Sequence, residues 1–388
     1  MRDTLVSALS TLSSLQRWNF LPRVETWVES ENIAYMAHMG YAIAKTSLGF
    51  NEEQISILLT RILLKSFNKH YLSDIPVHSR EILKNLDDGK IWEELVKEAA
   101  HKTSKLFPRS KKVSLNYYKY LSHNGEYYQD ITLKEKIEEL VKYLQYKTAY
   151  EECSINSQIY KNYYEEIIKE IENKINKLNS RETFEEGYKI LENYFYIIKK
   201  LKYIRRWNRI NRLIESSVLT HTFIVSFLVM FFSDLSENEI KENNEEKNFR
   251  LKAILKAMFH DVPESLSGDL ISPVKQALEK ISPNAWKKVE KDLIEKQIIK
   301  KASEAIKQDF DTYKLLDELN DKDPYSIDSL VKYCDKLALV IECVFEKNRG
   351  MMADEMTIAF HNYINDLQNS EWRYIREFTR RIAVEFPM

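Results

Sequence analysis

The stretch FIVSFLVMFF, residues 223–232, is the longest continuous apolar run in this chain of 388 residues. A membrane-spanning helix needs roughly 20 such residues, so the run predicts a helix buried in a protein core. In the segments 163–178 and 287–306, apolar residues recur three or four positions apart among charged ones, which is the helical period. No segment shows a sustained alternation of apolar and polar residues, so the predicted fold class is all-α.

The composition supports this fold class and limits the function. Glycine (7) and proline (8) are scarce, whereas a sheet protein of this length needs many tight turns built from them. A net charge of −1 argues against a protein that holds nucleic acid by bulk charge, so no nucleic-acid partner is expected. Three cysteines without a CxxC pair, together with the lack of a signal-peptide pattern, predict a cytoplasmic protein with no membrane partner.

The two halves of the chain repeat four short segments in the same order, spaced by about 190 positions. The pairs are RWNFLPR (17–23) with RWNRINR (206–212), SFNKHYLSDIP (66–76) with MFHDVPESLSGDLISP (258–273), LVKYLQYKTAYEEC (140–153) with LVKYCDKLALVIEC (330–343), and NKINKLNSRE (173–182) with NYINDLQNSE (362–371). Chance explains one such match more easily than four in register. We therefore predict a duplicated helical domain, with one copy in residues 1–195 and the other in residues 196–388.

The second half carries an ordered set of side chains suited to a divalent cation: His221, His260, Asp261 and Asp335. Imidazole and carboxylate groups are the ligands that borderline and hard divalent ions take in proteins. Neighbouring residues point about 100° apart on a regular helix, so His260 and Asp261 reach one ion only near a helix end, for which Pro263 gives a reason. Taken singly, each residue fits a core or surface position, whereas the ordered set favours a metal site.

With their flanking segments, these residues resemble the HD-domain metal-dependent phosphohydrolases, and most closely the bacterial 5′-deoxynucleotidases. The resemblance rests on RWNRINRLIESSVLTH (206–221), FHDVPESLSGDLISPVK (259–275) and YCDKL (333–337). It implies two tandem HD-type helical domains that form an internal pseudo-dimer. It also implies site residues in this chain: His221, His260, Asp261 and Asp335 as metal ligands, Glu264 as the catalytic carboxylate, and Arg206, Trp207 and Asp269 as contacts to the nucleotide.

The function that the resemblance implies is a metal-dependent phosphomonoesterase acting on 5′-(deoxy)nucleoside monophosphates, with catalysis in the second half. The implied cofactor is manganese, cobalt or magnesium, with nickel, zinc or iron as further options. Two alternatives stay open. One is a phosphodiesterase that uses the same four ligands on a cyclic or signalling nucleotide. The other is a nucleotide-responsive binding protein with a structural metal. Association of two chains into a homo-oligomer is also left open.

In the first half, the positions that align with the four predicted ligands hold Asn32, Asn68, Lys69 and Gln145. Neutral amides are poor ligands for a transition metal, and a lysine places a positive charge where the ion would lie. We expect this half to have lost metal-dependent hydrolysis.

Two interpretations of the first half remain. In the favoured one, it is the structural partner in the internal pseudo-dimer. In the other, it binds a ligand without cleaving it, and Arg17, Trp18, Arg23 and Lys69 remain as anion contacts.

Overall fold

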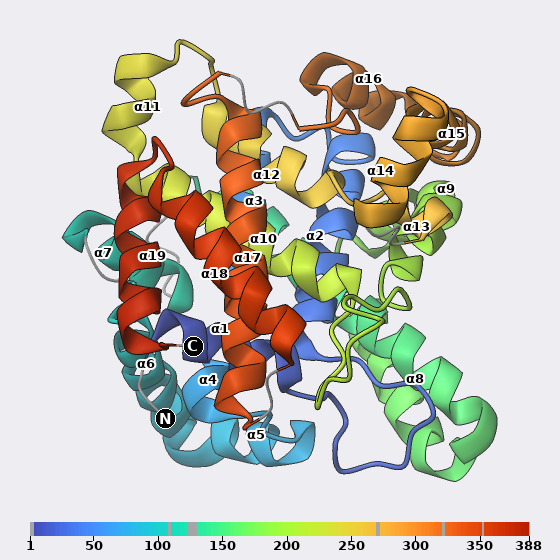
Figure 1. Cartoon of the computed structure of the whole chain (residues 1–388). Helices are drawn as coiled ribbons and strands as arrows, with labels where there is room; N and C mark the ends of the chain where they lie inside the picture. Colours follow the sequence, from blue (N-terminus) through green and yellow to red (C-terminus); the bar gives the residue numbers. More distant parts are fainter. Residues whose placement is uncertain are drawn as a thin grey trace. The chain divides into compact units, whose positions relative to one another are not determined.

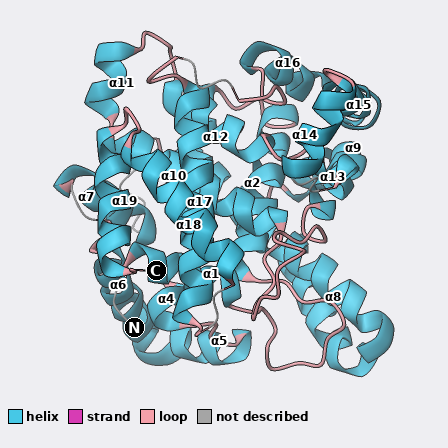
Figure 2. Ribbon diagram, in the orientation of Figure 1, coloured by secondary structure: helices cyan, strands magenta, loops and turns pink. Residues whose placement is uncertain are grey.

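The computed structural model describes residues 4–107, 110–122, 130–268, 272–319, 323–350 and 353–387. Throughout these ranges the chain forms helices joined by turns, and no strand is present (Figures 1 and 2). Two isolated antiparallel bridges, Gln16 with Val28 and Arg205 with Ser217, are the only β pairings among the described residues. The predicted all-α fold class is confirmed.

The chain divides into two compact units. The first comprises Met1–Leu48 and Gln54–Gly187, and the second comprises Gly49–Glu53 and Tyr188–Met388. The change from one unit to the next falls inside a helix, α9 (Arg181–Lys200). The duplication with copies in residues 1–195 and 196–388 therefore stays a prediction.

The first unit is built around α2 and the long helix α8. Its helices are α1 (Leu5–Ser14), α2 (Glu29–Thr46), α3 (Glu52–Leu64), α4 (Lys69–Leu72), α5 (Val77–Asn85), the 3-10 turn η1 (Leu86–Gly89), α6 (Lys90–Ser104), α7 (Lys111–Leu121) and α8 (Ile131–Asn176). The predicted helical segment 163–178 lies almost wholly in α8. At Tyr160 the backbone of α8 leaves the helical region (φ −111°, ψ 47°), so α8 is two helical segments joined at a kink.

The second unit is built around α10, α12 and α17. Its helices are α10 (Val218–Leu235), α11 (Glu237–Asn243), α12 (Phe249–Phe259), α13 (Glu264–Ser267), α14 (Ser272–Ile281), α15 (Ala285–Leu293), the π turn η2 (Ile294–Ile298), the 3-10 turn η3 (Ile299–Lys301), α16 (Glu304–Tyr313), α17 (Ile327–Asn348), α18 (Asp354–Gln368) and α19 (Arg373–Glu385). The helical period of segment 287–306 corresponds to helical elements, α15, η2, η3 and the start of α16, which are interrupted where Ala302 turns to extended backbone (φ −80°, ψ 154°) between η3 and α16.

Helix α10 contains the apolar run 223–232 and forms the centre of the second unit. It is long and apolar enough to cross a membrane by composition alone, yet 89% of the 18-residue window is buried inside the protein. Phe227 and Phe231 stack one turn apart with ring centroids separated by 6.1 Å. At the start of the helix, the Ser217 hydroxyl accepts a hydrogen bond from the Thr220 amide at 3.1 Å. The predicted buried helix is confirmed, and its first turn carries His221.

Each unit has the same turn before its first long core helix. Trp18 (φ 51°) and Trp207 (φ 57°) both occupy the left-handed region, which a bulky side chain adopts only where the surroundings enforce it. The backbone bonds also correspond. The amides of Leu21 and Ile210 donate to the carbonyls of Trp18 and Trp207, at 3.0 Å and 2.9 Å. This turn fixes the direction of the Arg-Trp pair in both units.

The two units also share the segment that follows the next core helix. Helices α3 and α12 each end in a turn, residues 65–68 and 260–263, which leads into the four-residue helices α4 and α13. An ion pair anchors each helix at a corresponding place: Arg61 with Glu138 at 2.7 Å, and Lys256 with Asp328 at 3.7 Å. These anchors define which residues of the two turns correspond.

Candidate active site

Two carboxylates on α17 lie on either side of the His221 ring. The Nε2 atom of His221 lies 2.7 Å from Oδ1 of Asp335, and its Nδ1 atom lies 3.1 Å from Oε1 of Glu342. Asp335 and Glu342 are two turns apart along α17, so they project from the same face of that helix. His221 and Glu342 are fully buried, whereas the Asp335 side chain is 30% exposed. The site therefore opens on the side of Asp335.

His260 and Asp261 reach the same place from the end of α12. The helix ends at Phe259, and His260 and Asp261 occupy the turn that follows. This helix end lets neighbouring side chains converge, as the sequence indicated. Ligand atoms of His221, His260 and Asp261 all lie within 4.8 Å of one another. Nδ1 of His260 lies 2.7 Å from the carbonyl oxygen of Ala257, which leaves Nε2 to face the cluster.

Arg206 lies among the carboxylates of the cluster without forming a close ion pair. Its Nη1 atom is 3.9 Å from Oδ2 of Asp261, and its Nε atom is 3.8 Å from Oε1 of Glu342. The buried Nε atom makes no hydrogen bond with any described residue. Burial alone would lower the pKa of Arg206, but nearby carboxylates, Glu342 first, outweigh it and raise that pKa. Arg206 is therefore a fixed cation with donor capacity to spare.

Trp207 is held by the same buried carboxylate that orients His221. Its indole Nε1 donates to Oε2 of Glu342 at 2.6 Å, so the two oxygens of Glu342 accept from two different rings. Glu342 was missed by the sequence reasoning. The available signal was a glutamate within the apolar run LALVIECVF, repeated as Glu152 before Cys153 in the first half.

The buried charges shift one another's protonation. Burial and the Arg206 charge lower the pKa of His221, but the hydrogen bonds that its ring donates to Asp335 and Glu342 outweigh them and raise it to about 9. Burial raises the pKa of Glu342, but the hydrogen bond from His221 and the charge of Arg206 bring it down to about 2. The Asp335 pKa is likewise held below its usual range, mainly by His221. His221 thus carries a proton between two carboxylates, at a place where a metal cation could take over the positive charge.

The donor set fits a divalent cation. Two imidazoles and the carboxylate of Asp261 converge, and Asp335 borders them through its contact with His221. Nε2 of His260 and Oδ2 of Asp261 are buried without a hydrogen bond to any described residue. Such orphaned acceptors are costly unless a ligand satisfies them. The Nδ1 contacts to Glu342 and Ala257 hold both rings in the orientation that a metal ligand needs.

Of the remaining predicted residues, Glu264 lies near the cluster and Asp269 lies outside the described residues. Glu264 is the first residue of α13, directly after the turn that holds His260 and Asp261. Its amide donates to the Asp261 carbonyl at 3.0 Å. Its charge also contributes to the raised pKa of Arg206. The structure thus gathers Arg206, Trp207 and Glu264 around the candidate ligands.

The corresponding place in the first unit differs from the residue alignment that the sequence suggested. Matching the turns 65–68 and 260–263 places Lys65 opposite His260 and Ser66 opposite Asp261. The same register places Lys69 opposite Glu264. The alignment of Asn68 and Lys69 with the His-Asp pair is therefore three positions too late, because it followed the shared aromatic Phe67 rather than the helix end. The conclusion drawn from it is unchanged, since neither lysine nor serine replaces a His-Asp ligand pair.

The known proteins that this chain resembles match the sequence of its second unit. The sequence profile described as 5′-deoxynucleotidase YfbR-like matches residues 193–386. A 5′-deoxynucleotidase of Pectobacterium atrosepticum is 29% identical over 171 residues, which are 43% of this chain and 78% of that protein. 5′-Deoxynucleotidases of Yersinia pestis and Yersinia pseudotuberculosis are each 28% identical over 160 residues, which are 41% of this chain and 76% of each relative.

Proposed function

Since the chain belongs to the YfbR-like family of 5′-deoxynucleotidases, which are HD-superfamily phosphohydrolases, we propose that its second unit hydrolyses 5′-deoxynucleoside monophosphates. The observation that carries the proposal is the convergence of His221, His260 and Asp261 within 4.8 Å, at the opening beside Asp335. HD-type phosphohydrolases use divalent metals, and this donor set fits one. Manganese, cobalt or magnesium is the ion we propose.

We propose that His221, His260, Asp261 and Asp335 hold the cation. When bound, it supplies Lewis acidity that polarises a phosphoryl oxygen and makes a water more acidic. Glu342 accepts from Nδ1 of His221 and holds a proton there, so Nε2, which now contacts Asp335, is the ring atom that would give up its proton to bind a cation. The carbonyl of Ala257 likewise accepts from Nδ1 of His260. Both rings are thereby oriented before the ion arrives.

Arg206 and Trp207 are proposed to hold the nucleotide. The guanidinium offers a forked donor to a phosphate dianion. Because neither Asp261 nor Glu342 lies closer than 3.8 Å, a phosphate can be accepted without breaking a short ion pair. The Trp207 ring, fixed at its nitrogen by Glu342, offers a flat face to the sugar or base. Asp269 is proposed as a further contact on the resemblance alone.

Glu264 is proposed as the group that moves protons during hydrolysis. It is the first residue of α13, directly after the turn that carries His260 and Asp261. A carboxylate there can take the proton of the attacking water and return it to the leaving oxygen of the nucleoside. Glu264 takes up one proton and gives up one proton in each cycle, so it ends the reaction in its starting ionised state.

The remaining proposals concern organisation and location. Two tandem copies of one helical domain would explain the shared Arg-Trp turn, the shared ion-pair anchors and the matching order of helices in the two units. An internal pseudo-dimer and a cytoplasmic location stay predictions, and so does the boundary at residue 195.

The proposed activity is tested by measuring phosphate release from a panel of ribo- and deoxyribonucleoside 5′-monophosphates. The full chain is assayed with manganese, cobalt or magnesium, and with chelator. We expect release that chelator abolishes and that favours deoxyribonucleotides. Conversion of cyclic nucleotides into linear monophosphates, with no phosphate released from the monophosphate panel, would replace the proposal with the phosphodiesterase alternative.

A matched pair of variants tests the role of Glu264. Glu264→Gln should lower turnover by about 100-fold or more while metal content stays unchanged, because a positioned acid–base typically contributes that much. Glu304→Gln is the control, because Glu304 is also the first residue of a helix in this unit but is 89% exposed. Full activity in Glu264→Gln would refute the assigned role.

A further inference from the structure

The first unit contains a cavity of about 290 Å³. That volume is close to the lower end of the range of about 300–1,000 Å³ typical of small-molecule sites. Five basic side chains line the cavity, against two carboxylates, Asp74 and Glu170. The basic residues are Arg17, Lys65, Lys69, Arg80 and Lys174. Carboxylates outside the lining pair with Arg17, Lys69 and Lys174. Among the described residues, the positive charge left without an ion pair is that of Lys65 and Arg80, and such charge in a concave site favours an anionic ligand.

The cavity is built from the elements that build the candidate active site in the second unit. Its walls include the Arg-Trp turn, the turn after α3, α4, and the middle of α8. At the positions of the proposed catalytic and metal-binding carboxylates, however, it carries Ser66, Lys69 and Gln145, and it has Lys65 opposite His260. The exchange removes three negative charges and adds two positive ones, so the place of a cation becomes a place for an anion.

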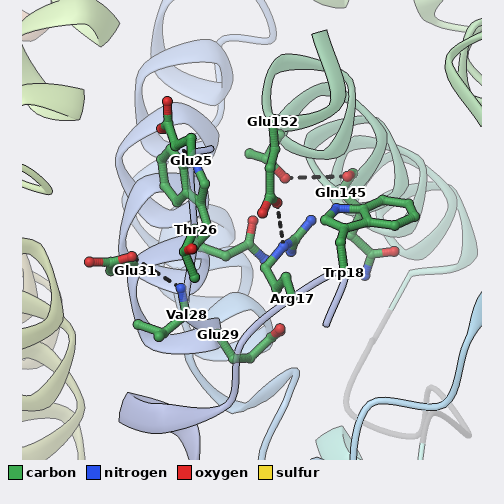
Figure 3. A network of polar contacts seen from close by, with 12 residues as sticks. Arg17, Trp18, Glu25, Thr26, Val28, Glu29, Glu31, Gln145 and Glu152 are labelled. Atoms are coloured by element: carbon green, nitrogen blue, oxygen red, sulfur yellow. Dashed lines mark hydrogen bonds and ion pairs between the residues drawn. The ribbon is translucent and has the colours of Figure 1, made fainter. Parts of the chain in front are cut away.

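The cations of the cavity are not all neutralised. Arg17 donates to Glu152 at 2.9 Å, and Lys69 contacts Glu29 at 2.8 Å and Asp74 at 2.9 Å. Figure 3 shows Arg17 between Glu152 and Trp18. Lys65 forms no ion pair with any carboxylate in the part of the chain that the structure describes. Its ammonium is therefore the natural counter-charge for a ligand.

One side of the cavity is aromatic. Trp18, Phe20 and Tyr146 line it, and the Trp18 and Phe20 rings lie 6.1 Å apart at 52°. The Trp207 indole nitrogen donates to a carboxylate, whereas the buried Trp18 Nε1 makes no hydrogen bond to any described residue. Aromatic faces beside a cationic floor suit a ligand with a flat ring and a phosphate, since bases stack on such side chains.

We propose that the first unit binds a nucleoside 5′-phosphate in this cavity, without a metal and without cleaving it. The phosphate contacts Lys65, Lys69 and Arg17, and the base stacks on the Trp18 side. Gln145 offers an amide to the sugar or phosphate where the second unit has Asp335. No hydrolysis follows, because the cavity lacks the imidazoles and carboxylates that would hold a cation. This site is independent of the function proposed for the second unit.

The protonation of Lys65 gives the proposed site a pH signature. Burial lowers the pKa of Lys65 most, Lys69, Arg17 and Arg61 lower it further, and Glu29 raises it, with a result of about 7. A phosphate binds the protonated form of Lys65. Above pH 7 the side chain is mostly neutral, so Lys65 must take up a proton when the phosphate binds. The affinity should fall as the pH rises from 7 to 9, by at most about tenfold per unit.

The test measures nucleotide binding to the metal-free full chain. Isothermal titration in chelator uses 5′-dAMP, with deoxyadenosine and inorganic phosphate as separate probes. Without metal, the four carboxylates of the second site (Asp261, Glu264, Asp335 and Glu342) should repel a phosphate, so binding reports the first unit. We expect one 5′-dAMP per chain, bound more tightly than either fragment and more weakly at higher pH.

Variants locate the binding. Lys65→Met should weaken 5′-dAMP binding by about tenfold or more, since it removes a charge-assisted contact, and should also abolish the pH dependence. Arg80→Met, a second lining cation, should weaken it by a smaller factor. The control is Lys136→Met, an exposed lysine of α8 away from the cavity. The far-UV circular dichroism of the full chain should be the same in all three as in the wild type, which shows that they fold.

Three results would overturn the proposal. The first is the absence of 5′-dAMP binding in chelator at millimolar concentration. The second is unchanged binding in Lys65→Met, which would place the ligand elsewhere. The third is inorganic phosphate that binds as tightly as 5′-dAMP, which would make the cavity a simple anion site. Failure of the activity assay would leave all of these measurements possible.

Discussion

The replacement Glu342→Gln tests how the buried carboxylate prepares the proposed metal site. Glu342 accepts from Nδ1 of His221 at 3.1 Å and from Nε1 of Trp207 at 2.6 Å, one ring on each oxygen. Glutamine keeps the shape but has one acceptor oxygen and one NH₂ donor. If the oxygen stays with the indole, the NH₂ group faces Nδ1 of His221. The imidazole proton then moves to Nε2, and the lone pair that a cation needs is lost.

The size of the effect follows from the contacts that change. A hydrogen bond to a charged group contributes about 1.5–3 kcal/mol, against about 0.5–1.5 kcal/mol for a neutral one. Replacing the charged acceptor of His221 by a neutral one therefore costs about 1–1.5 kcal/mol, the difference between corresponding ends of the two ranges. Since about 1.4 kcal/mol is a factor of ten, metal affinity should fall by about 5- to 12-fold. Loss of outer contacts to a metal-bound histidine typically costs about 10- to 100-fold.

The assay titrates metal-free protein with Mn²⁺ and records both binding and release of phosphate from 5′-dAMP. We expect a larger dissociation constant for the metal and partial recovery of turnover at saturating metal. The matched control is Glu152→Gln, which changes the buried glutamate at the corresponding place in the first unit, where Arg17 is its partner. Wild-type metal affinity in Glu342→Gln would refute the reasoning. So would an equal loss in Glu152→Gln, because that residue lies outside the proposed metal site.

Three further outcomes follow from the same contacts. His260→Ala should lose most of its bound metal in elemental analysis, and full occupancy in that variant would contradict the ligand assignment. Phe227→Ala should destabilise the second unit by about 3–5 kcal/mol, measured by denaturant unfolding, because a buried ring leaves a cavity in α10. Lys65→Met should exceed the wild type in stability most at or below pH 7. The pKa of Lys65 is lowered by burial to about 7 in the folded protein, from about 10.5 for an exposed lysine. The cost of the buried charge is therefore complete below pH 7 and vanishes as the pH rises to about 10.5. A stability difference that does not change with pH would contradict that origin.

The helical fold could be predicted because both of its signals are local. The scarcity of glycine and the three- to four-residue period are properties of short segments, and α10 was found from its apolar run alone. Helix interruptions were harder to see. The segment 287–306 keeps a helical period across the break at Ala302, and α8 continues through the kink at Tyr160 with no proline or glycine to mark it.

The candidate ligands could be predicted because their types and order are distinctive, whereas the groups that support them could not. Glu342 is separated from His221 by 121 positions, so only the packing of α10 against α17 shows that they meet. The sequence alignment of the first half with the second was displaced for a related reason. One shared aromatic residue cannot place a gap of three positions, whereas the helix ends and the pairs Arg61–Glu138 and Lys256–Asp328 can.

The cavity of the first unit was the feature least accessible from sequence. Arg17, Trp18 and Lys69 were recognised as candidate anion contacts, but Lys65 was not, because its alignment partner was misplaced. The charge balance of a cavity depends on which side chains face it, and that comes from the packing of α3, α4 and α8. Sequence alone favoured a structural role for this half, whereas the cavity supports a ligand.

The most direct test of the central claim is the release of phosphate from 5′-dAMP by metal-free full-length chain as Mn²⁺ is added back. The account predicts no turnover before addition, a rise that saturates with metal bound at the second unit, and no response in His221→Ala. Undiminished turnover in the metal-free chain, or a full response to Mn²⁺ in His221→Ala, would contradict it.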